Sequence, residues 1–204
     1  ALLNDILDFS KIEADKLDLA SEEFSLRQCV EAWHRKAEKA AIDYSFHMNL
    51  TYFDDAIAAE IPSLPGMGIT TLKVFTAYNE RLRLEDGSIF RVLRIARDHG
   101  MLVLLHAENG DVIETLTAEA LAAGHRTPEW HARTRPAWGA VEATLRACSL
   151  AAQAGAPLYV VHMNAGGEVD MLDYARARGV PVMGETCPQY LFLSLIHISE
   201  PTRP

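Results

Sequence analysis

The chain has 204 residues, of which 49% are hydrophobic, and its formal net charge is −9. The apolar content is enough for a substantial core, and an acidic chain without a basic stripe argues against nucleic acid or an anionic membrane as a partner. Its three cysteines are scattered without a CxxC spacing, which predicts reduced thiols. The sequence has no signal-peptide pattern and no apolar run of the roughly 18 residues that span a membrane. We therefore expect a cytoplasmic protein.

The predicted elements begin with an amphipathic helix at 2–20, where Leu2, Ile6, Phe9 and Ile12 recur at helical spacing. Acidic residues outnumber basic ones most strongly over residues 1–31, which indicates a boundary near their end. Strands and helices then alternate. The predicted strands are 41–50, 69–75, 101–105, 158–161 and 180–184, the helices are 54–61, 88–99, 111–123, 139–154 and 168–178, and 127–136 is a loop. This alternation is typical of a parallel α/β protein.

Three residues lie where predicted strands end: Lys73, His106 and His162. In β/α architectures, catalytic groups collect at the carboxyl ends of the strands. The intervals between the three fit whole βα units, which take roughly 30 residues or more each. A lysine and two histidines at one edge of a sheet predict a metal site.

Six stretches between about residues 33 and 192 resemble the cyclic amidohydrolases of the dihydropyrimidinase and D-hydantoinase group. They are WHRKAEKAAIDYSFHM, GITTLKVFTAY, LVLLHAENGDVIE, HARTRPAWGAVEAT, LYVVHM and GETCPQYL. The resemblance implies a TIM-like barrel beside a small β-sandwich, with about strands two to six of eight in this chain. The expected fold class is therefore α/β, a partial TIM-like (β/α) barrel of the amidohydrolase type preceded by an amphipathic helix.

The resemblance also implies roles for individual residues. Lys73 resembles the lysine that reacts with carbon dioxide and bridges two divalent metal ions, usually zinc, as a carbamate. His106 and His162 resemble ligands of the second metal ion, and Tyr78 resembles the tyrosine that binds substrate and steadies the oxyanion. Neutral imidazole suits zinc, and paired cations lower the pKa of a bridging water. The implied substrate is a small cyclic amide or ureide, and the implied parent protein is a homotetramer.

The match to the family site is incomplete. The family has a His-x-His pair after its first strand and an aspartate after a late strand, and this chain has neither, so three of six expected ligands are present. The string from His162 to Ala165 also lacks the serine that the family usually has there. We therefore expect the 204-residue chain to be inactive and poorly soluble.

Both ends of the chain resemble other sequences. NDILDFSKIEADKLDLASEEFSLRQCVE resembles sensor histidine kinases, and LSLIHISEPTRP resembles a translated sequencing adapter. The expected organisation is thus a foreign helical segment at 1–31, a partial barrel at 32–192 and a non-native tail at 193–204. Amplification across both joins from the source DNA tests this hypothesis, and one continuous product would contradict it.

Three alternative functions are compatible with parts of the sequence. A sensor histidine kinase would need its phospho-acceptor and ATP-binding boxes, which are absent from the sequence. A non-catalytic scaffold relative would lack the metal ligands, whereas Lys73, His106 and His162 are present. Allantoinase and dihydroorotase share the site, but HAENGD and GETCPQYL favour the hydantoinases.

Simpler structural explanations exist for each residue. Lys73 can be an ordinary strand-end lysine, His106 or His162 a core histidine, and Tyr78 a packing aromatic. Glu108 and Asp111 can suggest acid–base chemistry, but residues 109–111 are expected to form the loop and N-cap of the next helix. His131 lies in a loop that can line the mouth of the site, and Cys187 is expected to be a structural thiol.

Overall fold

The structure is a computed structural model that describes residues 26–192. The helix predicted at 2–20 and the tail at 193–204 lie outside the described residues. The chain divides into two compact units, residues 1–44 and 45–204. Each unit is described separately below.

Helix α2, Leu26–Ala37, is the described element of the first unit. The sequence analysis assigned no element to this segment. The helix buries Val30, and its last turn carries Arg35 and Lys36, whose positive charges suit the carboxyl end of a helix. It runs unbroken through the predicted join at residues 31 and 32.

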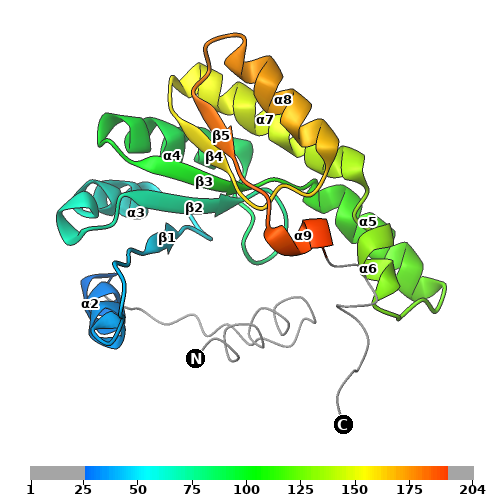
Figure 1. Cartoon of the computed structure of the whole chain (residues 1–204), viewed down its shortest axis with the longest axis horizontal. Coiled ribbons are helices and arrows are strands. Elements are labelled where there is room, and N and C mark those ends of the chain that lie inside the picture. Colours follow the sequence, from blue (N-terminus) through cyan, green and yellow to red (C-terminus); the bar gives the residue numbers. More distant parts are fainter. Residues whose placement is uncertain (1–25, 193–204) are drawn as a thin grey trace. The chain divides into compact units, whose positions relative to one another are not determined.

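The second unit is built on a five-stranded parallel sheet whose strands lie in chain order (Figure 1). The strands are β1 His47–Asn49, β2 Thr71–Phe75, β3 Leu102–His106, β4 Leu158–Val160 and β5 Val182–Gly184. Strict chain order in a parallel sheet is the arrangement of a β/α barrel, whereas a doubly wound sheet reverses direction at a switch point. All five predicted strands are present, although the first is much shorter than predicted because its pairing with β2 covers only His47–Asn49.

The helices of the second unit lie between successive strands, except for the last one, which follows β5. They are α3 Asp55–Glu60, η1 Ile61–Ser63, η2 Pro65–Met67, α4 Asp86–Asp98, α5 Gly110–Ala122, α6 Glu129–Arg133, α7 Ala137–Ala154, α8 Gly166–Arg176 and α9 Pro188–Phe192. Helices α4, α7 and α8 pack side by side along the sheet (Figure 1). Helix α6 lies in the segment that was predicted to be a loop, so that prediction was wrong there. The loop was predicted because turn-forming residues such as Pro128 and Pro136 flank this segment. The helix is short, and at its end the hydroxyl of Thr134 donates to the carbonyl of Trp130.

The two faces of the sheet have different environments. Leu72, Val103, Leu105 and Leu158 point to the helix-covered face and are completely buried. The opposite face carries a lateral row of neighbouring residues: Asn49, Lys73, Leu104, Tyr159 and Met183. Asn49 and Met183 at the two ends of this row are exposed. The helix-covered face is therefore a fully buried hydrophobic core. The opposite face corresponds to the interior of a barrel and is only partly covered.

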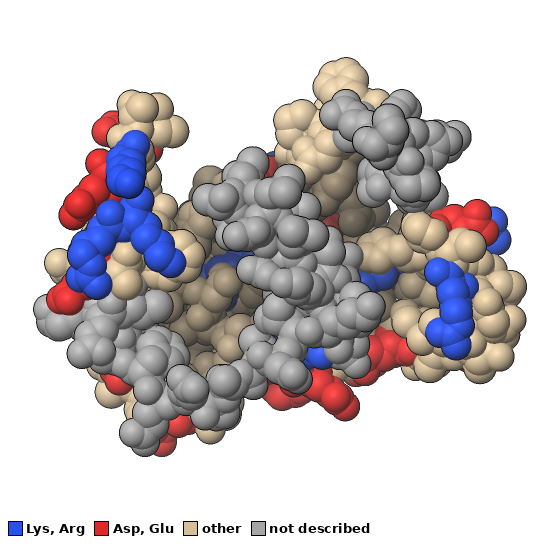
Figure 2. All heavy atoms as spheres, turned by 90° about the horizontal axis from the view of Figure 1, so that it is seen from below, with Lys and Arg blue, Asp and Glu red and all other residues tan. Residues whose placement is uncertain are grey.

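No helix within residues 26–192 is long and apolar enough to cross a membrane. On the face shown in Figure 2, the Lys and Arg side chains of the described residues form separate groups, with Asp and Glu beside them.

Candidate active site

The three predicted metal ligands lie toward the carboxyl ends of adjacent strands. Lys73 is in the middle of β2, His106 is the last residue of β3, and His162 follows the end of β4. In the register of the sheet, Phe75 pairs with His106, and Lys73 lies two residues before Phe75 on the same face. The strand geometry thus directs these side chains to one edge of one face.

The imidazoles of His106 and His162 are in contact. Nδ1 of His106 lies 3.2 Å from Nε2 of His162, and the ring centroids are 4.8 Å apart. Two nitrogens bound tetrahedrally to one zinc ion at about 2.0–2.1 Å are roughly 3.3 Å apart, so the observed spacing fits two ligands of a shared cation. Burial, followed by the charges of His106 and Lys73, lowers the pKa of His162 to about 4. His162 is therefore neutral at pH 7, which is the form that binds metal.

Lys73 is half-buried, and its amine deprotonates more readily than that of an ordinary lysine. Burial lowers its pKa from 10.5 to about 8, against the opposing charge of Glu185. Its Nζ lies 4.9 Å from the ring centroid of Phe75, and that ring lies 5.6 Å from the ring of His106. Phe75 thus fills the space between the lysine and the first histidine.

Tyr78 lies against the same histidine. Its ring centroid is 5.3 Å from that of His106 and 6.3 Å from that of Phe75. Its backbone is in the left-handed region, with φ of 64°, and His162 has φ of 41°. Among the described residues these are the two non-glycine positions with positive φ. Strained backbone of this kind gathers at functional sites, so the structure singles out two of the four residues that the sequence predicted.

Glu108 is a site residue whose position the sequence analysis missed. Its carboxylate is 8% exposed, and its Oε2 lies 2.7 Å from Nε2 of His106. Burial raises the pKa of Glu108, but the hydrogen bond and charge of His106, with the charges of Arg135 and His131, outweigh it and bring the pKa below the ordinary value. The available signal was the His-x-Glu spacing, which places both side chains on one side at a strand end.

The segment after Glu108 behaves as predicted. Asn109 is the N-cap of α5, and its side chain accepts a hydrogen bond from the backbone N–H of Val112 at 3.1 Å. Asp111 lies in the first turn of the same helix, where a negative charge is favourable. The expectation of a loop and N-cap at residues 109–111 is therefore confirmed.

Thr76 holds the backbone on which His106 and Glu108 stand. Its hydroxyl accepts the N–H of Glu108 at 3.0 Å, and it can donate to the carbonyl of His106 at 3.0 Å or of Glu108 at 2.8 Å. Thr76 is 2% exposed. A buried hydroxyl with backbone partners on both sides of a strand end fixes the path of the loop after β3.

The loop after His162 is held by a second buried carboxylate. Oε2 of Glu168 accepts the backbone N–H groups of Asn164 at 2.9 Å and Ala165 at 2.8 Å. Its Oε1 accepts the hydroxyl of Thr144 at 3.2 Å. The loop that departs from the usual family pattern is thus firmly anchored beside the histidine.

A polar cluster supports the loop that carries Tyr78. The side chain of Asn79 donates to Asp111 at 2.7 Å, and Arg83 donates to Asn79 at 3.1 Å and to Asp111 at 2.6 Å. Hydrogen bonding from Arg83 is the first cause that holds the pKa of Asp111 below its usual value. Gly110 makes room for this cluster, since a Cβ there would lie 2.2 Å from Oδ1 of Asn79 and 3.0 Å from the backbone of Ala77.

We therefore expect Gly110→Ala to lower the free energy of unfolding by about 1–3 kcal/mol, as overpacking of a tight site usually does. Gly87, in the first turn of α4, is the matched control because a Cβ there has nothing within 4 Å. Gly87→Ala should be neutral or stabilising by up to about 1 kcal/mol, since alanine favours helix. Urea unfolding measures both values. Equal values for the two variants would contradict the close approach at Gly110.

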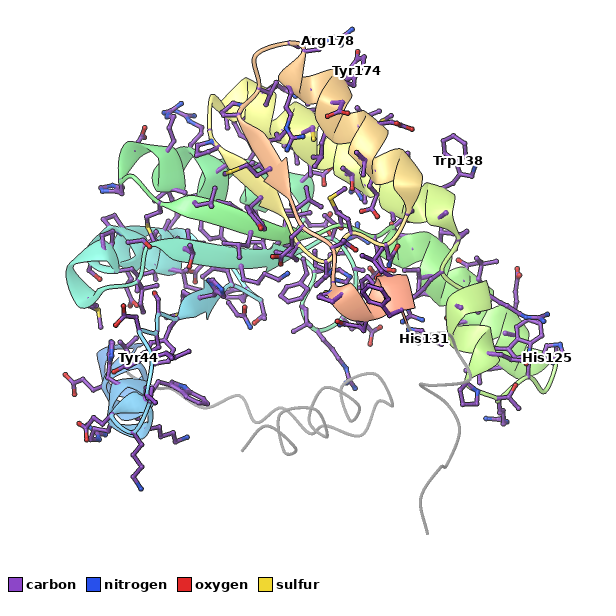
Figure 3. The ribbon with its side chains drawn as sticks, viewed as in Figure 1. Tyr44, His125, His131, Trp138, Tyr174 and Arg178 are labelled. Atoms are coloured by element: carbon purple, nitrogen blue, oxygen red, sulfur yellow. The ribbon has the colours of Figure 1, made fainter. Side chains whose placement is uncertain are left out.

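Other candidate residues have simpler surroundings. His125 stacks on Trp130 with ring centroids 3.8 Å apart, at the outer end of α5 and α6 (Figure 3). His131 contacts Arg135, with Nδ1 3.0 Å from a guanidinium nitrogen, and its charge acts on Glu108. Cys187 is a half-buried free thiol within the described residues. Of these, only His131 belongs to the surroundings of the site.

The described residues bring together only part of the predicted set of metal ligands. Within residues 26–192, no group of three or more His, Cys, Asp or Glu side chains is arranged to hold a metal ion. The donors that come together are two imidazoles and one lysine amine. Imidazoles suit zinc, whereas the lysine could serve only after conversion to an anion.

Comparison with known proteins identifies the relatives of the chain. No protein-family model matches it. It is 46% identical over 178 residues to the D-hydantoinase of Geobacillus stearothermophilus and 47% identical over 178 residues to that of Streptomyces coelicolor. These alignments cover 86% and 87% of the chain and 38% of each relative. The chain is homologous to part of the D-hydantoinases.

Solved structures of hydantoinases support the same relationship. A D-hydantoinase from a Bacillus species superposes with a TM-score of 0.81 and 45% identity, over 87% of this chain and 39% of that one. A dihydropyrimidinase from Brevibacillus agri superposes with a TM-score of 0.82 and 44% identity, over 90% and 40% of the two chains. The prediction of an α/β partial barrel of the amidohydrolase type is confirmed by these hydantoinase structures.

The chain thus spans about two fifths of the length of the hydantoinases that it matches. The 178-residue alignments are also longer than the interval 32–192, so they extend past at least one of the two predicted joins. The positions of those joins stay predictions, and most of residues 1–31 and all of 193–204 lie outside the described residues.

Proposed function

We propose that this chain is a segment of a metal-dependent hydrolase that opens cyclic amides or ureides, such as hydantoins and dihydropyrimidines. The observation that carries the proposal is the 3.2 Å approach of the His106 and His162 nitrogens beside Lys73, in a chain homologous to D-hydantoinases. The reaction adds water to a ring carbonyl and breaks the adjacent C–N bond. The carbonyl carbon becomes a carboxylate, and the ring nitrogen takes up a proton.

We propose that the complete site of the longer protein holds two divalent cations, which are zinc. His106 and His162 would hold one of them, and a carbamate on Lys73 would bridge both. When bound, the cations supply a hydroxide nucleophile and polarise the carbonyl. The chain here would contribute two imidazoles and the bridging anion, which are only part of the donors that two cations need.

Lys73 would gain its negative charge by reacting with carbon dioxide. The neutral amine forms a bond to the carbon of CO₂ and releases one proton, which leaves a carbamate with two oxygens. This step needs the neutral amine, and the pKa of about 8 provides it near physiological pH. Burial of the lysine against Phe75 therefore supports the proposed modification.

Tyr78 would act on the substrate. Its ring lies beside that of His106, and its hydroxyl would donate a hydrogen bond to the reacting carbonyl. A donor fixed in advance stabilises the oxyanion as negative charge develops on it. The strained backbone at Tyr78 agrees with a role that demands one orientation.

The test uses the longer protein that contains residues 26–192. Purified with zinc, it should hydrolyse hydantoin and dihydrouracil faster than allantoin and dihydroorotate, as measured by loss of the ring chromophore and by metal analysis. The 204-residue chain should be inactive, because the interior face of its sheet is only partly covered. Failure of the zinc-loaded longer protein to open any of the four rings would refute the proposal.

The proposal also covers the oligomeric state, the location and the partners of the parent protein. We infer a homotetrameric, cytoplasmic parent protein without nucleic-acid or membrane partners, which light scattering and cell fractionation would test. The alternative of a histidine-kinase segment rests on residues 1–31, most of which lie outside the described residues. An allantoinase or dihydroorotase would reverse the order of substrate preference given above.

A further inference from the structure

Glu108 is a buried carboxylate whose two oxygens face different partners. Oε2 lies 2.7 Å from Nε2 of His106, and Oε1 lies 3.9 Å from Nε of Arg135. A buried carboxylate is costly unless it is paired and hydrogen-bonded. Thr76 accepts the backbone N–H of the same residue, so two other segments, at Thr76 and Arg135, hold Glu108 in addition to its neighbour His106.

The ring of His106 has neighbours on several sides. The ring centroids of Phe75, Tyr78 and His162 lie 5.6, 5.3 and 4.8 Å from its own. In this orientation Nε2 faces Glu108, and Nδ1 faces Nε2 of His162 at 3.2 Å. The two nitrogens of one imidazole therefore have chemically different partners.

A carboxylate accepts hydrogen bonds and does not donate them. The nitrogen that faces Glu108 must therefore carry the hydrogen, and in the neutral ring the other nitrogen carries the lone pair. That lone pair points toward Nε2 of His162. Without a cation, Nε2–H of His162 can donate to it, and with a cation both lone pairs can bind the same ion.

We propose that Glu108 is a positioning residue that selects the Nε2–H tautomer of His106 and aims its Nδ1 lone pair at the space shared with His162. A carboxylate behind a metal-bound histidine fixes its tautomer and raises its basicity. Arg135 and Thr76 place the carboxylate. The use of this lone pair for a cation rests on the proposed function, whereas the tautomer itself does not.

The first experiment reads the tautomer directly. Long-range ¹H–¹⁵N correlation spectra of the metal-stripped protein, labelled in its histidines, show which ring nitrogen carries the hydrogen. His106 should be in the Nε2–H form. In Glu108→Leu, which keeps the bulk but removes the acceptor, the ratio of Nε2–H to Nδ1–H should fall by about tenfold or more, because Nδ1–H can then donate to His162.

Two further variants keep the test decisive. Glu108→Gln retains an acceptor oxygen without the charge. Its ratio of Nε2–H to Nδ1–H in His106 should therefore lie between the ratios of the unmodified protein and of Glu108→Leu. Asp173→Asn is the control, because Asp173 is a carboxylate of α8 that pairs with Arg176, a residue outside the site, at 3.3 Å. It should leave the His106 ratio unchanged. An Nδ1–H form in the unmodified protein, or an unchanged ratio in the Glu108 variants that fold, would overturn the proposal.

A second measurement separates this proposal from the proposed function. Zinc affinity of the longer protein, measured by competition with a chelator, should fall about 10–100-fold in Glu108→Gln and stay within about threefold in Asp173→Asn. If the unmodified protein binds no zinc and opens no ring, the proposed function fails while the tautomer result still decides the role of Glu108. Equal zinc affinities for the two variants would contradict the positioning role.

Discussion

Replacing Lys73 by methionine should abolish carbamate formation and should lower ring opening by the longer protein about 10³-fold or more, which corresponds to roughly 4 kcal/mol of transition-state stabilisation. Methionine keeps the length and apolar stem of the side chain but cannot react with carbon dioxide. Since the proposed bridging anion holds both cations, its loss removes the ligand that offsets their repulsion. The same variant should therefore also lose bound zinc.

The pH dependence of the carbamate follows from the pKa of Lys73. A lysine with a pKa of 10.5 is only about 0.3% neutral at pH 8, whereas a pKa of about 8 makes the amine half neutral there. Because the lowered pKa favours the neutral amine above pH 8, the carbamate signal in the metal-free protein should rise with a midpoint near pH 8. Carbon-13 NMR in labelled bicarbonate measures it.

Lys39→Met is the control for this experiment, since Lys39 is an exposed lysine in the other unit of the chain. It should leave the carbamate signal, the zinc content and the rate of ring opening unchanged. A signal that persists in Lys73→Met, or that appears only above pH 10, would show that Lys73 is not the modified residue.

Leu105→Ala should lower the free energy of unfolding by about 2–5 kcal/mol. Leu105 lies on the central strand β3, on the helix-covered face, and is completely buried. Truncation to alanine removes apolar contacts and leaves a cavity that the close-packed helices cannot fill. Since a domain has only about 5–15 kcal/mol of stability in total, this is a large fraction, and we expect the variant to be partly unfolded at 37 °C.

The matched control for Leu105 is Leu121 on α5, which is 45% exposed. Leu121→Ala should change the free energy of unfolding by no more than about 0.5 kcal/mol, as surface substitutions usually do. Urea unfolding followed by circular dichroism measures both. Similar losses for the two variants would mean that the helix-covered face of the sheet is not the main source of stability.

The strand ends were predictable because the information that marks them is local. A short apolar run predicts a buried strand, and His106 ends β3 while His162 follows the end of β4. Lys73 was predicted at a strand end and lies in the middle of β2. In a parallel sheet, the carboxyl ends of all strands lie at the same edge, so residues near those ends come close together. The sequence also predicted the residues of the α5 N-cap, since a cap depends on neighbours three residues away.

The errors in the predicted elements also have local causes. Helix α2 was not predicted because its segment mixes apolar and charged residues at the suspected boundary, and α6 was hidden by prolines on both sides. The strand predicted at 41–50 was too long because its apolar residues continue beyond the few that find a partner in β2. Pattern alone does not reveal where pairing stops.

The sequence by itself determined the order of strands and helices and the residues from which a metal site can be built. Only the tertiary structure decided how those residues are held. Glu108 faces His106 rather than solvent, burial lowers the pKa of Lys73 to about 8, and Tyr78 adopts a left-handed backbone. Each of these depends on the surroundings that the fold creates, including segments 30 or more residues away such as Thr76 and Glu108. Desolvation and hydrogen-bond geometry are properties of that environment, and no local pattern encodes them.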